Sequence, residues 1–300
     1  MADLCFITTC RGRLAHLQES LPTFVAQPGT SCVVVDYDCP QNTAAWVGKH
    51  YPQVAVVHAT DRPRFELSKA RNLGAQAANA PWLCFVDADV ELSPHFAAAV
   101  VPLLQAGHYY QPEPRSMELW GTCICHRDDF ERIEGYDDVL QGWGAEDRDL
   151  YTRLELIGAR SRPFNGDLLR SIPHETADRV EHYDVKDPRL NGTANFVYCR
   201  AKLDLMLLKR GSLRRETRVE LYNKLYQATL TACGSGQPLE ISITAYREET
   251  LSGGPLEARL VYRLPHLQGD SQALSSHRDA ETSLNHLERS GSANDFTSDR

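Results

Sequence analysis

Residues 82–89 read Trp-Leu-Cys-Phe-Val-Asp-Ala-Asp, a short apolar run followed directly by two carboxylates. An apolar run of this length predicts a strand that is buried on both faces. In a mainly parallel sheet, Asp87 and Asp89 would then lie beyond the carboxyl end of the strand, where ligands bind. Two carboxylates there suit Mg²⁺ or Mn²⁺, which prefer oxygen ligands, phosphate included. An Asp-x-Asp triplet alone is also typical of a solvated turn, so its place after the strand is what favours a metal site.

The segments around this run alternate strands with helices. Other apolar runs predict strands at 4–8, 31–36 and 54–58. Apolar residues at helical spacing predict helices at 15–24, 43–50, 67–78 and 94–104. This alternation predicts an α/β fold with a mostly parallel sheet and helices on both of its faces.

The second half of the chain is less regular. It predicts a strand at 121–126, a glycine-rich loop at 135–144, helices at 128–133, 146–157, 201–209 and 219–232, and a strand pair at 239–246 and 256–262. Residues 266–300 are rich in polar residues and poor in apolar ones, which predicts a disordered tail. We therefore divide the chain into an α/β domain (1–195), a helical and β-hairpin extension (196–265) and the tail (266–300).

Composition and charge limit the classes of function. The chain has 300 residues, enough for one large α/β domain with an appendage. Its net charge of -8 argues against nucleic acid as a partner, because such binding needs a basic surface. We see no signal peptide, and no apolar run approaches the roughly 18 residues of a transmembrane segment. Nine cysteines without a paired framework suggest reduced thiols, so we expect a cytoplasmic protein, free or peripheral to the inner membrane face.

A second motif, Gly142-Trp-Gly-Ala-Glu-Asp-Arg-Asp149, opens the helix predicted at 146–157. Its acids stand at a helix N-terminus, where the helix dipole stabilises negative charge. A tryptophan between two glycines can stack on the face of a sugar, and an adjacent carboxylate can take a proton from a hydroxyl group. An ordinary acidic first turn would explain one or two of the acids, but it leaves Trp143 without a role.

Three further groups are candidates for binding. The turn Thr9-Cys-Arg-Gly-Arg13 presents two arginines that can hold an anionic or planar group, although surface ion pairing would also account for them. On the helix at 67–78, Lys69 and Arg71 cannot both face the core, so one of them faces a pocket unless the helix has a solvated basic face. His174 is a metal ligand only if the fold returns it to Asp89, since a lone histidine is otherwise structural or solvated.

Several of these residues occur in the order typical of a known family. The chain resembles the family 2 glycosyltransferases of the GT-A fold in Asp36 and in the segments 68–74, 85–89, 135–138 and 142–147. The last segment looks like the galactosyltransferase and N-acetylgalactosaminyltransferase branch, including chondroitin-polymerase-type domains. The turn at 9–13 is also similar to a stretch of β-1,4-galactosyltransferases. The resemblance covers residues 3–180, and the ordered set of motifs is far more specific than any single one.

The resemblance implies a Rossmann-like GT-A domain and an inverting, metal-dependent reaction. The donor would be a UDP-linked hexose or N-acetylhexosamine, and the acceptor a hydroxyl group of a glycan, a lipid-linked glycan or a protein. Carried over by position, Mn²⁺ or Mg²⁺ would be held by Asp89 and His174, with Asp87 at the ribose or the metal. Asp147 would be the general base, with Glu146 and Trp143 at the donor or acceptor sugar. The nucleotide pocket would be formed by Thr9, Arg11, Arg13 and Asp36, with Arg71 near the diphosphate.

The chain departs from the family pattern at two places, which concern the nucleotide contacts more than the metal contacts, and two other functions are open. Thr9 stands where the family usually has proline, and Asp36-Tyr-Asp-Cys-Pro40 replaces the common Asp-Asp-Gly-Ser. A sugar-phosphate nucleotidyltransferase would share the sheet and the acids, but it usually carries a glycine-rich phosphate loop, of which this chain has only Arg11-Gly-Arg13. A non-catalytic carbohydrate-binding scaffold is the other alternative, because a fold does not guarantee a function.

Overall fold

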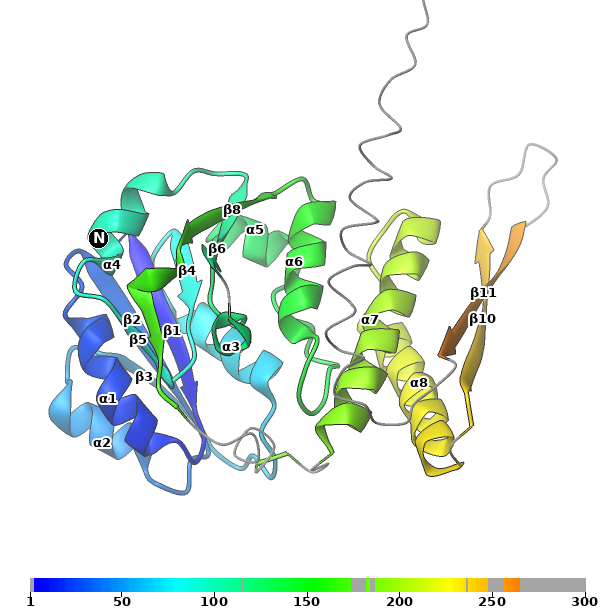
Figure 1. Ribbon diagram of the computed structural model, residues 1–300, viewed down its shortest axis with the longest axis horizontal. Coiled ribbons are helices and arrows are strands. Elements are labelled where there is room, and N and C mark those ends of the chain that lie inside the picture. Colours follow the sequence, from blue (N-terminus) through cyan, green and yellow to red (C-terminus); the bar gives the residue numbers. More distant parts are fainter. Residues whose placement is uncertain are drawn as a thin grey trace, which may run out of the picture.

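The computed structural model describes residues 3–114, 116–173, 182–183, 187–235, 237–247 and 256–264. The main sheet consists of seven strands: β1 (Leu4–Cys10), β2 (Thr30–Tyr37), β3 (Ala55–Ala59), β4 (Trp82–Phe85), β6 (His108–Glu113), β7 (Cys123–His126) and β8 (Arg160–Asn165). Their order is β3-β2-β1-β4-β7-β6-β8 (Figure 1). All seven run parallel except β7, which is antiparallel to both of its neighbours. The predicted α/β class with a mostly parallel, mixed sheet is confirmed.

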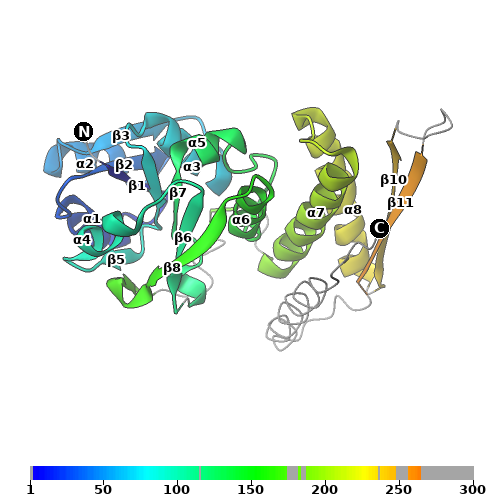
Figure 2. The same ribbon diagram turned by 90° about the horizontal axis from the view of Figure 1, so that it is seen from above.

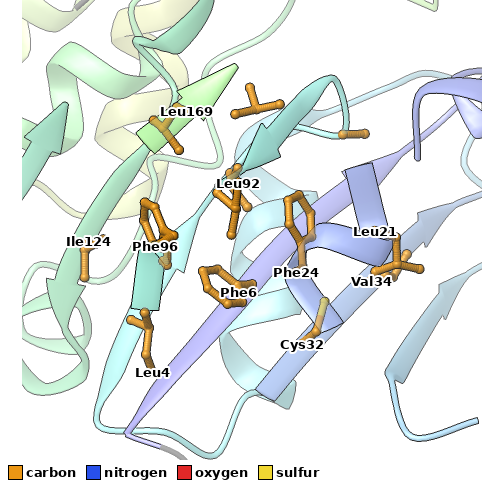
Figure 3. Close-up of a cluster of buried hydrophobic side chains, with 14 of the residues drawn as sticks. Leu4, Phe6, Leu21, Phe24, Cys32, Val34, Leu92, Phe96, Ile124 and Leu169 are labelled. Atoms are coloured by element: carbon orange, nitrogen blue, oxygen red, sulfur yellow. The ribbon is translucent and has the colours of Figure 1, made fainter. Parts of the chain in front are cut away.

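Helices cover both faces of this sheet. Side chains alternate between the faces along each strand, and the central strands carry apolar side chains on both faces. They are α1 (Leu14–Val25), α2 (Thr43–His50), α3 (Leu67–Ala77), α4 (Phe96–Val100), α5 (Arg127–Arg132) and α6 (Glu146–Leu156). Phe6 of β1 packs between α1 and α4, with its ring centroid 5.8 Å from that of Phe24 and 5.9 Å from that of Phe96 (Figure 3). Ile7, the next residue, lies in the core of the opposite face, with Phe130 of α5.

A small second sheet lies next to the carboxyl end of β4. It pairs β5 (Val90–Leu92) with β9 (Leu169–Ser171) in antiparallel orientation. Just past β9, the amide of Ile172 donates a hydrogen bond to the carbonyl oxygen of Asp89 at 2.7 Å. The fold therefore returns a late segment of the chain to the Asp-x-Asp motif.

The carboxyl-terminal part consists of two long helices and a hairpin. They are α7 (Pro188–Lys209), α8 (Arg215–Ser235), β10 (Leu239–Arg247) and β11 (Leu256–Leu264). They build a third hydrophobic core, in which Tyr198, Leu225 and Ile241 are buried. In both views, α7 lies between the hairpin and the α6 side of the main sheet (Figures 1 and 2). Within the described ranges, none of the helices combines the length and apolar character needed to span a membrane.

The main differences from the sequence-based expectations are four unpredicted strands and a longer helix. β5, β6, β8 and β9 were not predicted, and β8 shows why: of its six residues only Phe164 is buried, so no apolar alternation exists. Helix α7 begins at Pro188 rather than at residue 201, so the predicted boundary between 195 and 196 falls inside a continuous helix. The predicted disordered tail, 266–300, lies outside the described residues.

Candidate active site

Arg71 joins the two acidic motifs of the sequence. Its side chain is 3% exposed on α3, and Nη1 lies 2.5 Å from Oδ1 of Asp147 while Nη2 lies 2.8 Å from Oδ1 of Asp87. The planar guanidinium can serve two carboxylates at once, which compensates for its burial. Lys69, on the same helix, instead pairs with Glu66 at 2.6 Å and is partly exposed. Of the two basic residues on this helix, Arg71 is thus the one at the candidate site.

Asp89 is held by the arginine turn. Nη1 of Arg13, the residue before α1, lies 2.5 Å from Oδ2 of Asp89, which is 6% exposed. The turn that follows β1 and the acids that follow β4 therefore meet at the carboxyl ends of two adjacent parallel strands. This is the edge of the sheet where a ligand site is expected.

Glu146 and Asp147 open α6 beside this cluster. Burial, and after it the negative charge of Asp147, raises the pKa of Glu146 to about 8. The pKa of Asp147 is also raised, because burial disfavours its charge more than Arg71 favours it. At neutral pH, Glu146 therefore holds a proton and can donate a hydrogen bond. Of the two acids, Asp147 is the one that is paired directly with an arginine side chain.

Two residues of this cluster received no role from the sequence. A side chain at Gly121 would place its Cβ 2.6 Å from Oδ2 of Asp87 and 2.7 Å from Nη2 of Arg71, so the site needs a glycine there. The ring of Tyr136 lies under the Arg71 guanidinium, 5.0 Å from centroid to Cζ. Tyr136 belongs to the segment 135–138 that supports the family resemblance, so a signal for it was present.

The predicted nucleotide-binding residues have structural contacts of their own. Arg11 donates from Nη1 to the carbonyl oxygens of Tyr37, at 3.1 Å, and Arg62, at 2.6 Å. Both carboxylate oxygens of Asp36 accept hydrogen bonds from the backbone, from the amides of residues 39 and 44 at 2.7 and 2.6 Å. Thr9 is half-buried near the end of β1. These contacts account for Arg11 and Asp36 without a ligand, and their role in nucleotide binding stays a prediction.

A two-residue described segment, His182–Tyr183, covers part of the site. A Cβ on Gly12, where φ is +71°, would lie 1.7 Å from Nε2 of His182, so the arginine turn is in close contact with this histidine. Tyr183 is 5% exposed and packs on Phe65 with centroids 5.6 Å apart. Burial, followed by the charge of Glu146, raises the pKa of Tyr183. Neither residue was predicted from the sequence, whereas His174 of the same region was.

Asp87 and Asp89 are the candidate cation ligands that the structure describes. Their oxygens fit a hard cation that takes its other ligands from phosphate or water, and the Asp87 side chain is 35% exposed. No set of three His, Cys, Asp or Glu side chains within the described part of the chain could hold a metal ion. His174 lies outside that part. Ile172, two residues before His174, is hydrogen-bonded to the backbone of Asp89.

The loop that carries Trp143 is attached to helix α7. Nδ2 of Asn195 lies 3.0 Å from the carbonyl oxygen of Gln141, 2.9 Å from that of Gly144 and 3.4 Å from that of Trp143. Trp143 itself is half-buried. The motif predicted to hold the donor or acceptor sugar is therefore next to the acid cluster and in contact with the carboxyl-terminal helices.

Two family models match adjoining parts of the chain. Residues 5–116 match the model described as "Glycosyl transferase family 2", and residues 104–185 match "N-terminal domain of galactosyltransferase". Among curated proteins, mouse beta-1,4-galactosyltransferase 2 is 28% identical over 47% of this chain, and human beta-1,4-galactosyltransferase 6 is 25% identical over 48%. The alignments span 41% and 43% of those proteins, less than half of their length.

Solved structures share the fold at low sequence identity. A Pyrobaculum calidifontis mannosyltransferase, in complex with GDP-Man and Mn²⁺, aligns with a TM-score of 0.53 and 17% identity over 78% of this chain and 75% of its own. TarS from S. aureus, residues 1–349 in complex with UDP-GlcNAc, gives 0.53 and 13% over 77% and 73%. The fold of this chain is thus that of GT-A glycosyltransferases.

Proposed function

This chain belongs to the family 2 and galactosyltransferase-like glycosyltransferases, and we propose that it transfers a sugar from a nucleotide-diphosphate donor to an acceptor hydroxyl group. We propose a UDP-linked hexose or N-acetylhexosamine as donor, Mn²⁺ or Mg²⁺ as cofactor, and a glycan, lipid-linked glycan or protein as acceptor. These details go beyond family membership, because the chain spans less than half of the curated relatives it matches.

The observation that carries the proposal is the bridge from Arg71 to Asp87 and Asp147. It places an acid that follows β4 and an acid that begins α6 on one guanidinium, at distances of 2.8 and 2.5 Å. A donor diphosphate and an acceptor hydroxyl must meet in one place for transfer to occur. The bridge joins a motif suited to the first with a motif suited to the second.

Asp147 is the proposed general base. It takes the proton of the acceptor hydroxyl as that oxygen attacks the anomeric carbon from the face opposite to the leaving diphosphate, so the configuration inverts. Glu146, protonated at neutral pH, donates a hydrogen bond to a sugar oxygen. A general base contributes roughly 10²–10⁴ in rate, which is the size of effect the proposal assigns to Asp147.

The donor diphosphate would be bound by two kinds of positive charge, arginine side chains and a divalent metal ion. Arg13 and Arg71 each pair with an acid of the Asp-x-Asp motif and can instead donate to phosphate oxygens. Asp89, with Asp87 beside it, would hold a divalent cation, which supplies charge neutralisation for the leaving diphosphate. Asp87 and Asp89 would then pair with the divalent cation, and Arg13 and Arg71 with phosphate oxygens, so that every charged group keeps a partner of opposite charge.

Thermal unfolding with nucleotides tests this function without an acceptor. Wild type, Asp89→Ala and the control Asp128→Ala, whose side chain is 83% exposed, are each melted with UDP, GDP, CMP or dTDP, in Mn²⁺ or in chelator. A nucleotide at 100 times its Kd adds about 2.7 kcal/mol of stability. We expect a shift with UDP that needs Mn²⁺, is kept in Asp128→Ala and is lost in Asp89→Ala. A shift that ignores Mn²⁺ contradicts the metal site, and no shift with any nucleotide favours the scaffold alternative.

A further inference from the structure

Helix α7 contacts the Trp143 loop, which we define as residues 141–145, through Asn195. This side chain is 1% exposed, and its amide nitrogen faces three carbonyl oxygens of the loop. Its Oδ1 accepts a hydrogen bond from the hydroxyl group of Tyr222 on α8 at 3.0 Å. The side-chain amide of Asn195 therefore donates to the loop and accepts from Tyr222 of the extension, so it connects the two.

The Trp143 loop depends on such a link because its backbone is irregular. Gly142, Gly144 and Ala145 have φ angles of +70°, +100° and +72°. Backbone in this region follows no helix or strand ladder, so its carbonyl groups need other partners. Asn191 fills the space beside the loop, since a Cβ on Gly142 would lie 2.5 Å from its side chain. Helix α7 thus determines the shape of the loop by hydrogen bonding and by contact.

The shape of the loop in turn sets the start of α6. Ala145 is the residue before the helix, and Glu146 and Asp147 are its first two residues. The same loop, with Gln141 and Gly142, lines a small pocket together with Phe65, Tyr183 and Tyr226. The position of the two acids and of Trp143 relative to this pocket follows from how the loop is held.

We propose that Asn195 of α7, which is hydrogen-bonded to Tyr222 of the carboxyl-terminal extension, is a positioning residue that holds Trp143 and the two acids in place for the acceptor sugar. The inference rests on the proposed transferase function and assigns the extension a part in it. Asn195 acts through the loop carbonyls and touches no reacting atom. Its loss therefore impairs acceptor use and leaves the nucleotide side, built by Arg13, Arg71 and Asp89, intact.

The first variant is Asn195→Asp, which keeps the size of the side chain. Its carboxylate still accepts from Tyr222 but meets the three loop carbonyls with acceptors instead of donors. We expect kcat/KM for the acceptor to fall 10- to 100-fold at a temperature where the protein is fully folded. The Mn²⁺-linked melting shift with UDP should stay at the wild-type value. Arg200→Ala, at an exposed position of α7 where the guanidinium pairs with the more buried Asp204, is the control on the same helix and should change neither.

A double-mutant cycle separates positioning from general structural support. If Asn195 acts through the loop, Asn195→Asp should cost less in a Trp143→Ala background than in wild type, because effects of coupled residues do not multiply. Asn195→Ser, which removes the amide without adding charge, enters the same cycle if the aspartate variant does not fold. Fully multiplicative losses, or a loss of UDP binding that parallels the loss of transfer, would overturn the inference.

Failure of this inference is distinguishable from failure of the function. A wild-type protein that releases no UDP from any UDP-sugar with acceptor present contradicts the proposed function itself. A wild-type protein that transfers sugar, with Asn195 variants that transfer equally well, contradicts the positioning role alone.

Discussion

Replacement of Lys202 by methionine tests how strongly the carboxyl-terminal extension is bound to helix α6. The Lys202 ammonium group lies 2.7 Å from Oδ2 of Asp137 and 2.5 Å from Oδ1 of Asp149, and the three side chains are 2%, 0% and 4% exposed. Removing one partner of a buried ion pair costs about 3–5 kcal/mol, because the remaining charge stays buried and uncompensated. Asp149 is only two residues past the proposed base, so this contact fixes α6 from the extension side.

The geometry places the expected loss at the lower end of that range. After Lys202→Met, Asp149 keeps the Nε of Arg153 at 2.8 Å and Asp137 keeps Nη1 of Arg218 at 2.7 Å. Each carboxylate therefore retains one cation, and we expect a loss of about 3 kcal/mol. For a chain of this size, a change of 1 kcal/mol moves Tm by about 2–4 °C, so Tm should fall by about 6–12 °C.

The assay is calorimetric unfolding of wild type, Lys202→Met and the control Arg200→Met. Arg200 is on the same helix and pairs with Asp204 at 3.0 Å, but its side chain is 58% exposed. Such an exposed pair contributes about 0.3–0.5 kcal/mol, so the control should lie within about 2 °C of wild type. A Lys202→Met protein as stable as the control, or more stable than wild type, would refute the reasoning. It would mean that burying the charges costs as much as their attraction returns.

The same network predicts an acid-sensitive stability. Burial alone would raise the pKa of Asp137, but Lys202 and then Arg218 hold it well below its usual range. A depressed folded-state pKa contributes stability above the unfolded value near 4 and loses it as pH falls below that value. Wild type should therefore lose stability between about pH 4 and 2 more steeply than Lys202→Met, as urea unfolding at each pH would measure.

Three changes in the acid cluster have distinct expected outcomes. Asp147→Asn should keep the Mn²⁺-linked UDP melting shift and lower kcat by about 10²–10⁴, and near wild-type transfer would remove Asp147 as base. The folded-state pKa of Glu146, about 8, exceeds the unfolded value, so the folded protein loses stability as pH rises from about 4 to 8. Glu146→Gln should therefore have a higher Tm than wild type at pH 8 and the same Tm below pH 4. A variant with the Tm of wild type at both pH values would contradict the raised pKa. Gly121→Ala should push Asp87 from Arg71, destabilise by about 1–3 kcal/mol and weaken UDP binding, whereas unchanged Tm and binding would show that the site yields without cost.

The main sheet was predictable where burial leaves a simple pattern in the sequence. β1, β2 and β4 are buried almost throughout, and each is a run of apolar residues close to its predicted bounds. β8 is an edge strand that exposes most of its side chains, and β6 beside it is only partly buried, so neither shows a continuous apolar run or clean alternation. Their pairing is long-range, and nothing in the local sequence of either strand specifies it.

The sequence predicted which residues form most of the candidate site, but only some of the contacts between them. The acids and Arg71 were selected because of their place after strands or at a helix start, and the structure brings Asp87, Asp147 and Arg71 together. The pairing of Arg13 with Asp89 depends on the adjacency of β1 and β4, which are separated in sequence by two other strands. No motif encodes that adjacency. Gly121 was missed for the same reason, since its role exists only once Asp87 and Arg71 are in place.

The first part of helix α7 escaped prediction because polar residues interrupt the face that it buries. Its buried residues include Asn191, Asn195, Tyr198, Lys202 and Leu205, which follow the helical spacing of four and three residues. A search for apolar periodicity finds only the last part of such a helix, and that is where the prediction began. Asp187-Pro188 did mark the start, since the Asp187 side chain caps the amides of residues 189 and 190. Buried polar groups are retained only when they have partners. Here the partners are the Trp143 loop and Asp149, so the polar stripe itself indicates a helix that docks on the proposed active site.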